Sequence, residues 1–173
     1  MHAIGRTHQA NGVWDDAIVA YERVFDDYPA AEVIAQARLD VAECRINLGE
    51  WAEARSLYAE FVERYGRHPQ AQMGQARIDV LKQLGRFQDL LADDDVDRNK
   101  DDAQFQIGRT VLGQLQNPIK AVEEFRKVVA NFANSDVADD AQLEIGKALL
   151  SLGRMDDGRV ELFEAEEVAG LGH

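Results

Sequence analysis

Apolar and aromatic side chains recur along this chain at intervals of three and four residues, with polar residues between them. In an α-helix this spacing places the apolar side chains on one face, whereas a half-buried β-strand needs strict alternation. Such alternation does not extend over any useful length here, so the pattern predicts an all-α protein. Three segments carry the stripe most clearly: Trp14, Ile18, Tyr21, Phe25 and Tyr28; Trp51, Leu57, Tyr58, Phe61 and Tyr65; and Ile119, Val122, Phe125, Val129 and Phe132.

A glycine-containing phrase returns at nearly constant distance along the chain. Gly12 and Gly49 are 37 residues apart, Gly85 follows Gly49 by 36, and Gly153 stands in the same phrase. Glycine adopts a positive φ without a side-chain clash, so each of these glycines is predicted to mark the turn between two helices. A fixed period of this length is typical of a stack of helix pairs.

The period divides the chain into five expected units, each an A helix followed by a B helix. Their approximate spans are 1–29, 31–66, 69–99, 101–133 and 136–169. Pro29 and Pro69 lie between units and Pro118 opens a helical segment, which are positions where proline does not break a helix. We therefore expect residues 1–173 to form a single α-solenoid whose neighbouring units bury each other's apolar faces.

Small residues occupy one position of the A helices and one of the B helices. The A-helix position before each turn holds Gly5, Ala42, Gly108 or Gly146. The matching B-helix position, 12 or 13 residues later in the chain, holds Ala17, Ala54, Ala121 or Gly158. This recurrence predicts points where two helices cross closely. Enlarging Ala54 or Ala121 to leucine is expected to cost roughly 1–3 kcal/mol through overpacking.

At these positions the chain resembles the tetratricopeptide repeat family. The pattern is carried by Gly5, Gly12, Ala17, Tyr21 and Pro29, then by Ala42, Gly49, Ala54 and Tyr58, and later by Gly108, Ala121 and Phe125. The joints at 27–32 and 131–136 are similar to those of bacterial cell-envelope repeat proteins. That group includes the Tol–Pal-associated periplasmic protein and the lipoprotein of the outer-membrane β-barrel assembly machine.

The resemblance implies a right-handed superhelix and a non-enzymatic scaffold that binds a peptide or a partner protein. It also implies the bacterial periplasm or cell envelope as location, with the cytoplasm as the alternative. In this family the A helices line the concave face. The expected partner-binding residues are Arg6, Gln9, Leu39, Glu43, Asn47, Gln75, Asp79, Lys82, Phe105, Arg109, Leu143 and Lys147.

Net charge narrows the class of partner. The formal charge of the 173 residues is −13 at pH 7, which opposes binding to nucleic-acid backbones or anionic lipid. No apolar run approaches the roughly 18 residues that span a bilayer, so no direct membrane insertion is expected. Protein or peptide partners, within a multi-subunit complex, fit this composition best.

An alternative function is that of a structural subunit in a larger envelope or membrane-associated assembly. The first A helix starts at Met1 without an opening turn, and nothing after Val168 supplies a polar capping helix. Terminal repeats normally need such caps for solubility. The expectation is that the chain is a segment or subunit of something larger.

Catalytic motifs are missing, so no enzymatic activity and no cofactor are expected. The four histidines are scattered, and neither a His-Glu-x-x-His motif nor a glycine-rich phosphate loop occurs. Cys44 falls inside a predicted helix without a nearby histidine, which favours a buried structural thiol over a nucleophile.

A weaker alternative is a calcium-responsive module in the acidic segment 93–102. Asp95, Asp97, Asn99 and Asp101 have the alternate spacing that turns oxygen ligands towards one Ca²⁺ ion. Against calcium, Lys100 stands where such loops favour glycine, and Gln106 stands where a glutamate would close the ligand shell. The other interpretation is a solvated loop whose aspartates cap a helix starting near Asp102.

Overall fold

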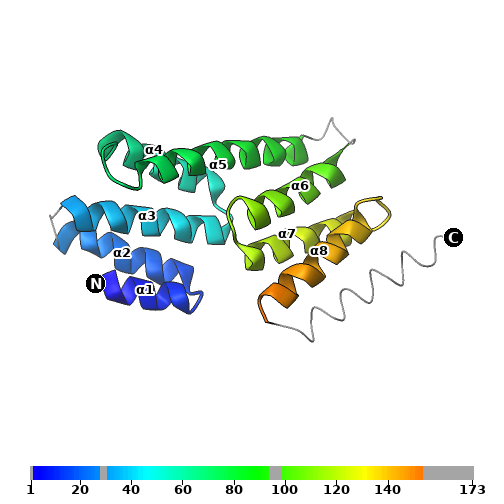
Figure 1. The fold of residues 1–173 in the computed structure, drawn as a ribbon, viewed down its shortest axis with the longest axis horizontal. Coiled ribbons are helices and arrows are strands. Elements are labelled where there is room, and N and C mark those ends of the chain that lie inside the picture. Colours follow the sequence, from blue (N-terminus) through cyan, green and yellow to red (C-terminus); the bar gives the residue numbers. More distant parts are fainter. Residues whose placement is uncertain (1, 28–30, 94–98, 154–173) are drawn as a thin grey trace. The chain divides into compact units, whose positions relative to one another are not determined.

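The computed structural model describes residues 2–27, 31–93 and 99–153, and all regular secondary structure within these ranges is α-helical. The all-α prediction is therefore confirmed. The chain divides into two compact units, Met1–Gly85 and Arg86–His173, and each is described by itself (Figure 1). The organisation of residues 1–173 as one array of five units stays a prediction.

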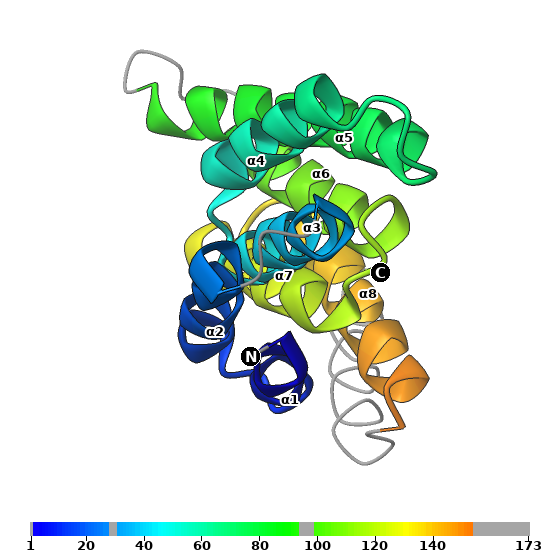
Figure 2. The same cartoon turned by 90° about the vertical axis from the view of Figure 1, so that its left-hand side faces the viewer.

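The first unit holds two antiparallel helix pairs and most of a long fifth helix. The pairs are α1 (His2–Ala10) with α2 (Trp14–Asp27), and α3 (Ala31–Leu48) with α4 (Trp51–Arg64). The fifth helix, α5 (Ala71–Ala92), extends past the end of this unit. Each of α1 to α4 packs against its neighbour in sequence, and α2 and α3 lie side by side in both views of the fold (Figures 1 and 2).

The second unit repeats this arrangement with α6 (Lys100–Gly113), α7 (Pro118–Asn131) and α8 (Ala138–Ser151). The helix α7 packs against both α6 and α8. Its start follows the expected chemistry, because Pro118 stands in the first turn and the Asn117 side chain accepts a hydrogen bond from the Lys120 backbone N–H at 3.0 Å. The predicted stripe of α7 contains one error. Ile119 is 61% exposed, since it lies in the first turn outside the face that Ala121, Val122 and Phe125 bury.

Glycine turns occur where the recurring phrase predicted them in three of four cases. Gly12, Gly49 and Gly153 have φ values of 72°, 82° and 76°, in the left-handed region that favours glycine. These turns let the chain reverse direction within a helix pair. In the turn before α7 a non-glycine residue, Gln116, takes the positive φ of 55°.

The turn predicted at Gly85 is wrong. Gly85 lies inside α5, which continues to Ala92 without interruption. Continuation keeps the backbone hydrogen bonds of this stretch, whereas glycine inside a helix costs only about 1 kcal/mol relative to alanine. A turn at Gly85 would gain little burial, because the aspartates begin at Asp93. A second helix between the two would be too short to bury a full apolar face. The helix ends at Ala92, directly before the acidic segment 93–102.

Close aromatic contacts join the A and B helices of a pair. A Cβ atom added to Gly5 would lie 2.6 Å from the Tyr21 ring, and one added to Gly108 would lie 2.5 Å from the Phe125 ring. Both rings are fully buried. The small residues thus leave the space into which the aromatic side chain of the following helix packs. Ala17, Ala42, Ala54 and Ala121 are likewise fully buried, as predicted for close helix crossings.

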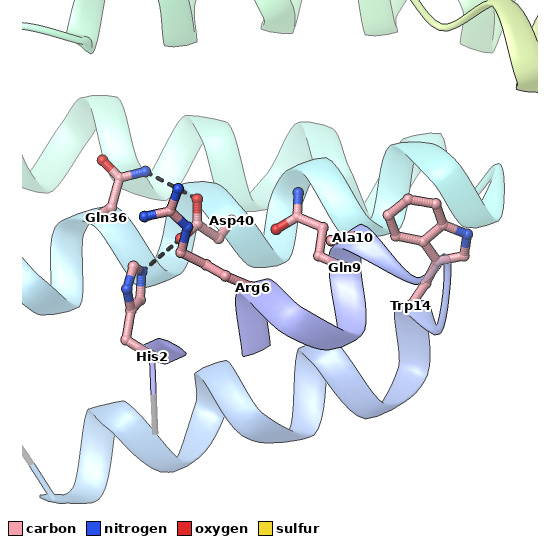
Figure 3. Close-up of a pocket in the computed structure, with 7 residues that line it drawn as sticks. All are labelled: His2, Arg6, Gln9, Ala10, Trp14, Gln36 and Asp40. Carbon is pink, nitrogen blue, oxygen red and sulfur yellow. Dashed lines mark hydrogen bonds and ion pairs between the residues drawn. The ribbon is translucent and has the colours of Figure 1, made fainter. Parts of the chain in front are cut away.

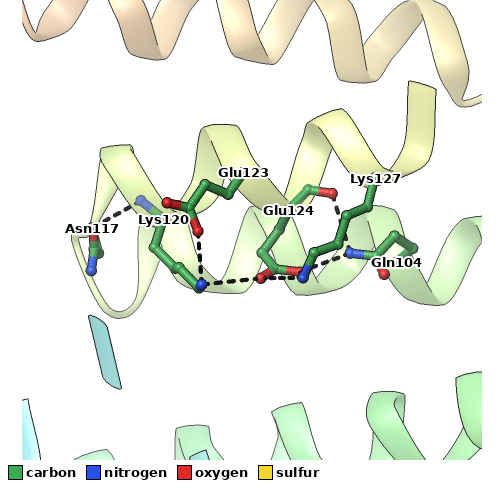
Figure 4. Close-up of polar contacts among 6 residues, drawn as sticks. All are labelled: Gln104, Asn117, Lys120, Glu123, Glu124 and Lys127. Atoms are coloured by element: carbon green, nitrogen blue, oxygen red, sulfur yellow. Dashed lines mark hydrogen bonds and ion pairs between the residues drawn. The ribbon is translucent and has the colours of Figure 1, made fainter. Parts of the chain in front are cut away.

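A buried polar pair links α6 to α7, which the sequence did not predict. Gln104 and Glu124 are 6% and 2% exposed, and the Gln104 amide donates to the Glu124 carboxylate at 3.0 Å and to its backbone carbonyl at 3.2 Å (Figure 4). The Lys127 ammonium lies 2.8 Å from both carboxylate oxygens. A buried carboxylate is costly without such partners, so this group ties the two helices in one register.

Substitution of glycine by alanine should change stability in opposite directions at a glycine in close contact and at one with free space around it. Gly108→Ala should lower the free energy of unfolding by about 1–2 kcal/mol, because the clash with Phe125 outweighs the gain in helix propensity. Gly85→Ala is the matched control, since a Cβ there meets nothing within 4 Å. It should raise stability by up to about 1 kcal/mol. Urea denaturation followed by circular dichroism measures both, and equal effects of the two substitutions would contradict the packing argument.

Candidate partner-binding surface

A hollow of about 610 Å³ opens between α1 and α3 in the first unit (Figure 3). From α1 it is lined at positions 2, 6, 9 and 10, which share one face of a helix. Gln36 and Asp40 approach from α3, one helical turn apart, and Trp14 closes the end at the start of α2. Both predicted partner-binding residues of α1, Arg6 and Gln9, therefore lie in the lining.

The carboxylate of Asp40 is held in place from two sides. Its Oδ2 atom lies 2.7 Å from Nε2 of His2, and its Oδ1 atom accepts a hydrogen bond from the Gln36 amide at 2.9 Å (Figure 3). The His2 ring also lies 5.4 Å from the Tyr21 ring, measured between centroids. The acidic group of the hollow is thus already partnered within the protein.

Gln9 is oriented by a buried phenol. The Tyr21 hydroxyl donates to the Gln9 side-chain oxygen at 2.6 Å. Burial raises the pKa of Tyr21, and the nearby charge of Asp40 raises it further, so this hydroxyl stays a donor at neutral pH. The hydrogen bond fixes the amide of Gln9 at the edge of the hollow.

Arg6 brings positive charge to the hollow. Its side chain is exposed and makes no ion pair with any residue that the structure describes. In Figure 3 its guanidinium group extends over the hollow in front of α3. An exposed guanidinium without a partner is well suited to bind a carboxylate from another molecule.

Glu43 and Asn47, also predicted to bind a partner, make contacts within the first unit. The Glu43 carboxylate accepts a hydrogen bond from the Tyr58 hydroxyl and lies 3.4 Å from Nε of Arg77. Burial, followed by the charge of Glu43, raises the pKa of Tyr58. The Asn47 amide donates to the Glu43 backbone carbonyl at 2.9 Å. These contacts join α3, α4 and α5.

Two predicted apolar anchors belong to the core. Leu39 is 2% exposed and Phe105 is 9% exposed, so neither presents its side chain at the surface. The Phe105 ring instead packs against Phe125, with 5.5 Å between centroids. An apolar residue at a groove position can be a surface contact or a core side chain, and the sequence alone does not separate the two.

The other predicted residues are spread over three helices. Gln75, Asp79 and Lys82 are exposed on α5, where Asp79 and Lys82 form an ion pair at 3.4 Å. Arg109 is exposed on α6. On α8, Leu143 is half-buried, and Lys147 pairs with Glu144 at 2.8 Å. Contact of these residues with a partner stays a prediction.

Five residues that line the hollow are not among the predicted partner-binding residues: His2, Ala10, Trp14, Gln36 and Asp40. The apolar stripe predicts that Trp14 packs against the core, and it does so while it also lines the hollow. The spacing of Gln36 and Asp40 by one helical turn does indicate that both side chains lie on the same face of a helix. Its meaning depends on which side of α3 faces α1, and that requires the packing.

The calcium hypothesis falls mostly outside the residues that the structure describes, since Asp95 and Asp97 lie there. Asn99 precedes α6 with a left-handed φ of 69°, and α6 begins at Lys100, earlier than predicted. The Asp101 carboxylate accepts a hydrogen bond from the Ser135 hydroxyl, which lowers its pKa. The described ranges hold no cluster of three potential metal ligands of the His, Cys, Asp or Glu type. Calcium binding by segment 93–102 stays a prediction.

The sequence itself matches a known family over most of its length. The family model of YfiO, described as outer membrane lipoprotein, matches residues 1–158. The chain belongs to the YfiO outer membrane lipoprotein family. This confirms the resemblance to tetratricopeptide-repeat proteins of the bacterial cell envelope.

Solved structures with similar helical repeats accompany this match. A Podosopora anserina kinesin light chain protein with TPR-like repeats is 18% identical, with 97% of this chain and 92% of that chain covered and a TM-score of 0.42. The protein MamA is 14% identical in one structure, with 98% and 94% covered and a TM-score of 0.44. In another it is 20% identical, with 95% and 93% covered and a TM-score of 0.41. No curated protein matches the chain.

The YfiO family assignment places this chain among cell-envelope proteins. None of the helices in the described ranges combines the length and the apolar composition needed to cross a membrane.

Cys44 provides a test of how tightly the first unit is packed. The thiol is free and fully buried, and burial, followed by the charge of Asp40, raises its pKa to about 12. Because the thiolate is the reactive form, Cys44 should react with a thiol reagent at pH 8 only when the unit opens. The rate measured with 5,5′-dithiobis(2-nitrobenzoate) should be negligible in buffer and rise steeply in urea. Rapid reaction in buffer would show that the packing around α3 is loose.

Proposed function

We propose that this YfiO-family chain is a non-enzymatic scaffold that binds a peptide or partner protein through its A helices in the bacterial periplasm. The observation that carries the proposal is the hollow between α1 and α3, where Arg6, Gln9 and Trp14 converge on one surface. Its volume suits a few side chains of another polypeptide. Arg6 offers an unpaired charge, and Gln9 offers an oriented amide.

The polar contacts of the first unit support binding rather than catalysis. Burial is the main cause that raises the pKa values of Tyr21, Cys44 and Tyr58. A raised pKa keeps each of these groups protonated and unreactive at neutral pH. The two tyrosine hydroxyls donate hydrogen bonds across the helix pairs, and the exposed groups of the hollow remain for recognition.

The alternative that the chain is a structural subunit of a larger envelope assembly is compatible with the same surface. A subunit of this kind would also use exposed residues of the A helices, but it would use the B helices as well. The two forms of the proposal therefore differ in which helices contact a partner.

Site-specific photo-cross-linking separates these possibilities. Benzoylphenylalanine at Arg6 of α1, or at Arg109 of α6, should yield discrete cross-linked products when the full chain is expressed in the source organism. The matched control positions are Glu22 of α2 and Ala130 of α7, which are exposed on B helices. Products from the A helices alone support the peptide-binding scaffold.

Products of equal yield from both kinds of helix would favour the structural subunit. Products from the B helices alone would overturn the assignment of the binding face to the A helices. Circular dichroism of each purified variant confirms that the label leaves the helices intact.

A further inference from the structure

Three hollows adjoin along one edge of the first unit. The hollow at Arg6 shares His2 and Gln36 with a second of about 560 Å³, which Pro69 also lines. The second shares His68 with a third of about 630 Å³, bounded by Ala35 and residues 63–68. These three hollows, which adjoin through shared lining residues, are here called the edge groove. It runs along α1 and the first half of α3 to the turn between α4 and α5.

The edge groove differs in charge from the rest of the chain. Three arginines line it, Arg6, Arg64 and Arg67, against two acidic residues, Asp40 and Glu63. The lining therefore carries a net positive charge with histidines neutral, whereas the whole chain carries −13. None of the three arginines makes an ion pair with the residues that the structure describes, while both Asp40 oxygens are already bonded. Glu63 is exposed and likewise makes no ion pair with these residues, so the three unpaired arginines of the groove face one unpaired carboxylate.

The remaining lining suits an extended backbone. Gln9, Gln36 and Gln70 supply amide groups, and extended peptides need such donors and acceptors for their own N–H and C=O groups. Trp14 and Tyr65 supply aromatic surface at the two ends. The groove is also preformed near its turn, since the His68 ring packs edge-on against Phe61 at 5.3 Å and its Nδ1 accepts from the Gln70 backbone N–H at 3.2 Å. Preformed sites lose less entropy on binding.

We infer that the edge groove binds an acidic, extended peptide segment of a partner protein. The inference rests on the proposed scaffold function and adds the chemistry of the partner. Glutamate or aspartate side chains of the segment would pair with Arg6 at one end and with Arg64 and Arg67 at the other. A protein segment fits better than an anionic bilayer or a nucleic acid, because a chain of charge −13 is repelled by large polyanionic surfaces.

Fluorescence anisotropy with synthetic peptides tests this inference on the full chain. The probe is a short fluorescein-labelled peptide with glutamate at alternate positions, and its twin carries glutamine at each of these positions. The glutamate peptide should bind, and its affinity should fall as ionic strength rises. Arg6→Glu and Arg67→Glu should each weaken binding about five- to tenfold, because each replaces an attraction with a repulsion.

Arg23→Glu is the matched control, since it makes the same charge change on the exposed surface of α2, outside the groove. It should change affinity less than about twofold. Equal binding of the two peptides, or equal effects of all three substitutions, would overturn the inference. Binding to phosphatidylglycerol vesicles that the Arg6→Glu and Arg67→Glu substitutions abolish, without binding of the glutamate peptide, would also overturn it in favour of a lipid surface.

The two proposals fail in different ways. If cross-links form at Arg6 but the glutamate peptide does not bind, the scaffold function stands and the acidic partner is rejected. If the glutamate peptide binds but cross-links come only from the B helices, binding of acidic peptides by the edge groove is supported. The assignment of the cellular partner to the A helices is then wrong.

Discussion

The structure depends on aromatic rings that pack against residues almost without side chains. Tyr21 occupies the space over Gly5, and Phe125 occupies the space over Gly108. A larger residue on the A helix would push the B helix away and expose the ring, so the distance between paired helices is set by these contacts. The same contact positions the surface residues, because the phenol that packs over Gly5 also orients Gln9 at the edge of the hollow.

Sequence periodicity is sufficient to predict the helices and most of their turns, but not to predict which residues line the surface hollows. The positions of the helices follow from the spacing of apolar residues, and Gly12, Gly49 and Gly153 follow from the backbone geometry of a turn. At Gly85 the same phrase stands within a helix, because a turn forms only where the segment beyond it can bury a face of its own. Similarity within the short phrase itself does not indicate whether the segment after it can bury an apolar face.

The surface residues were harder to predict for a related reason. Groove positions of the repeat identify which residues lie on the A helices, but burial decides which of them reach solvent. Leu39 and Phe105 occupy such positions and are buried, whereas Gln36 and Asp40 lie elsewhere in the repeat and line the hollow. Charge distribution shows the same limit. A total charge of −13 does not indicate a groove with net positive charge, whose Arg6 is more than fifty residues from Arg64 and Arg67 in sequence.

The order of packing has a consequence for the kinetics of folding. The principal contacts within each unit join helices that are consecutive in the chain: α1 with α2, α2 with α3, α3 with α4, α6 with α7, and α7 with α8. Chains dominated by such short-range contacts reach their native topology quickly, because little loop entropy is lost before each contact forms. Each helical hairpin can therefore fold once its own residues are synthesised, because its principal contacts do not involve residues distant in sequence.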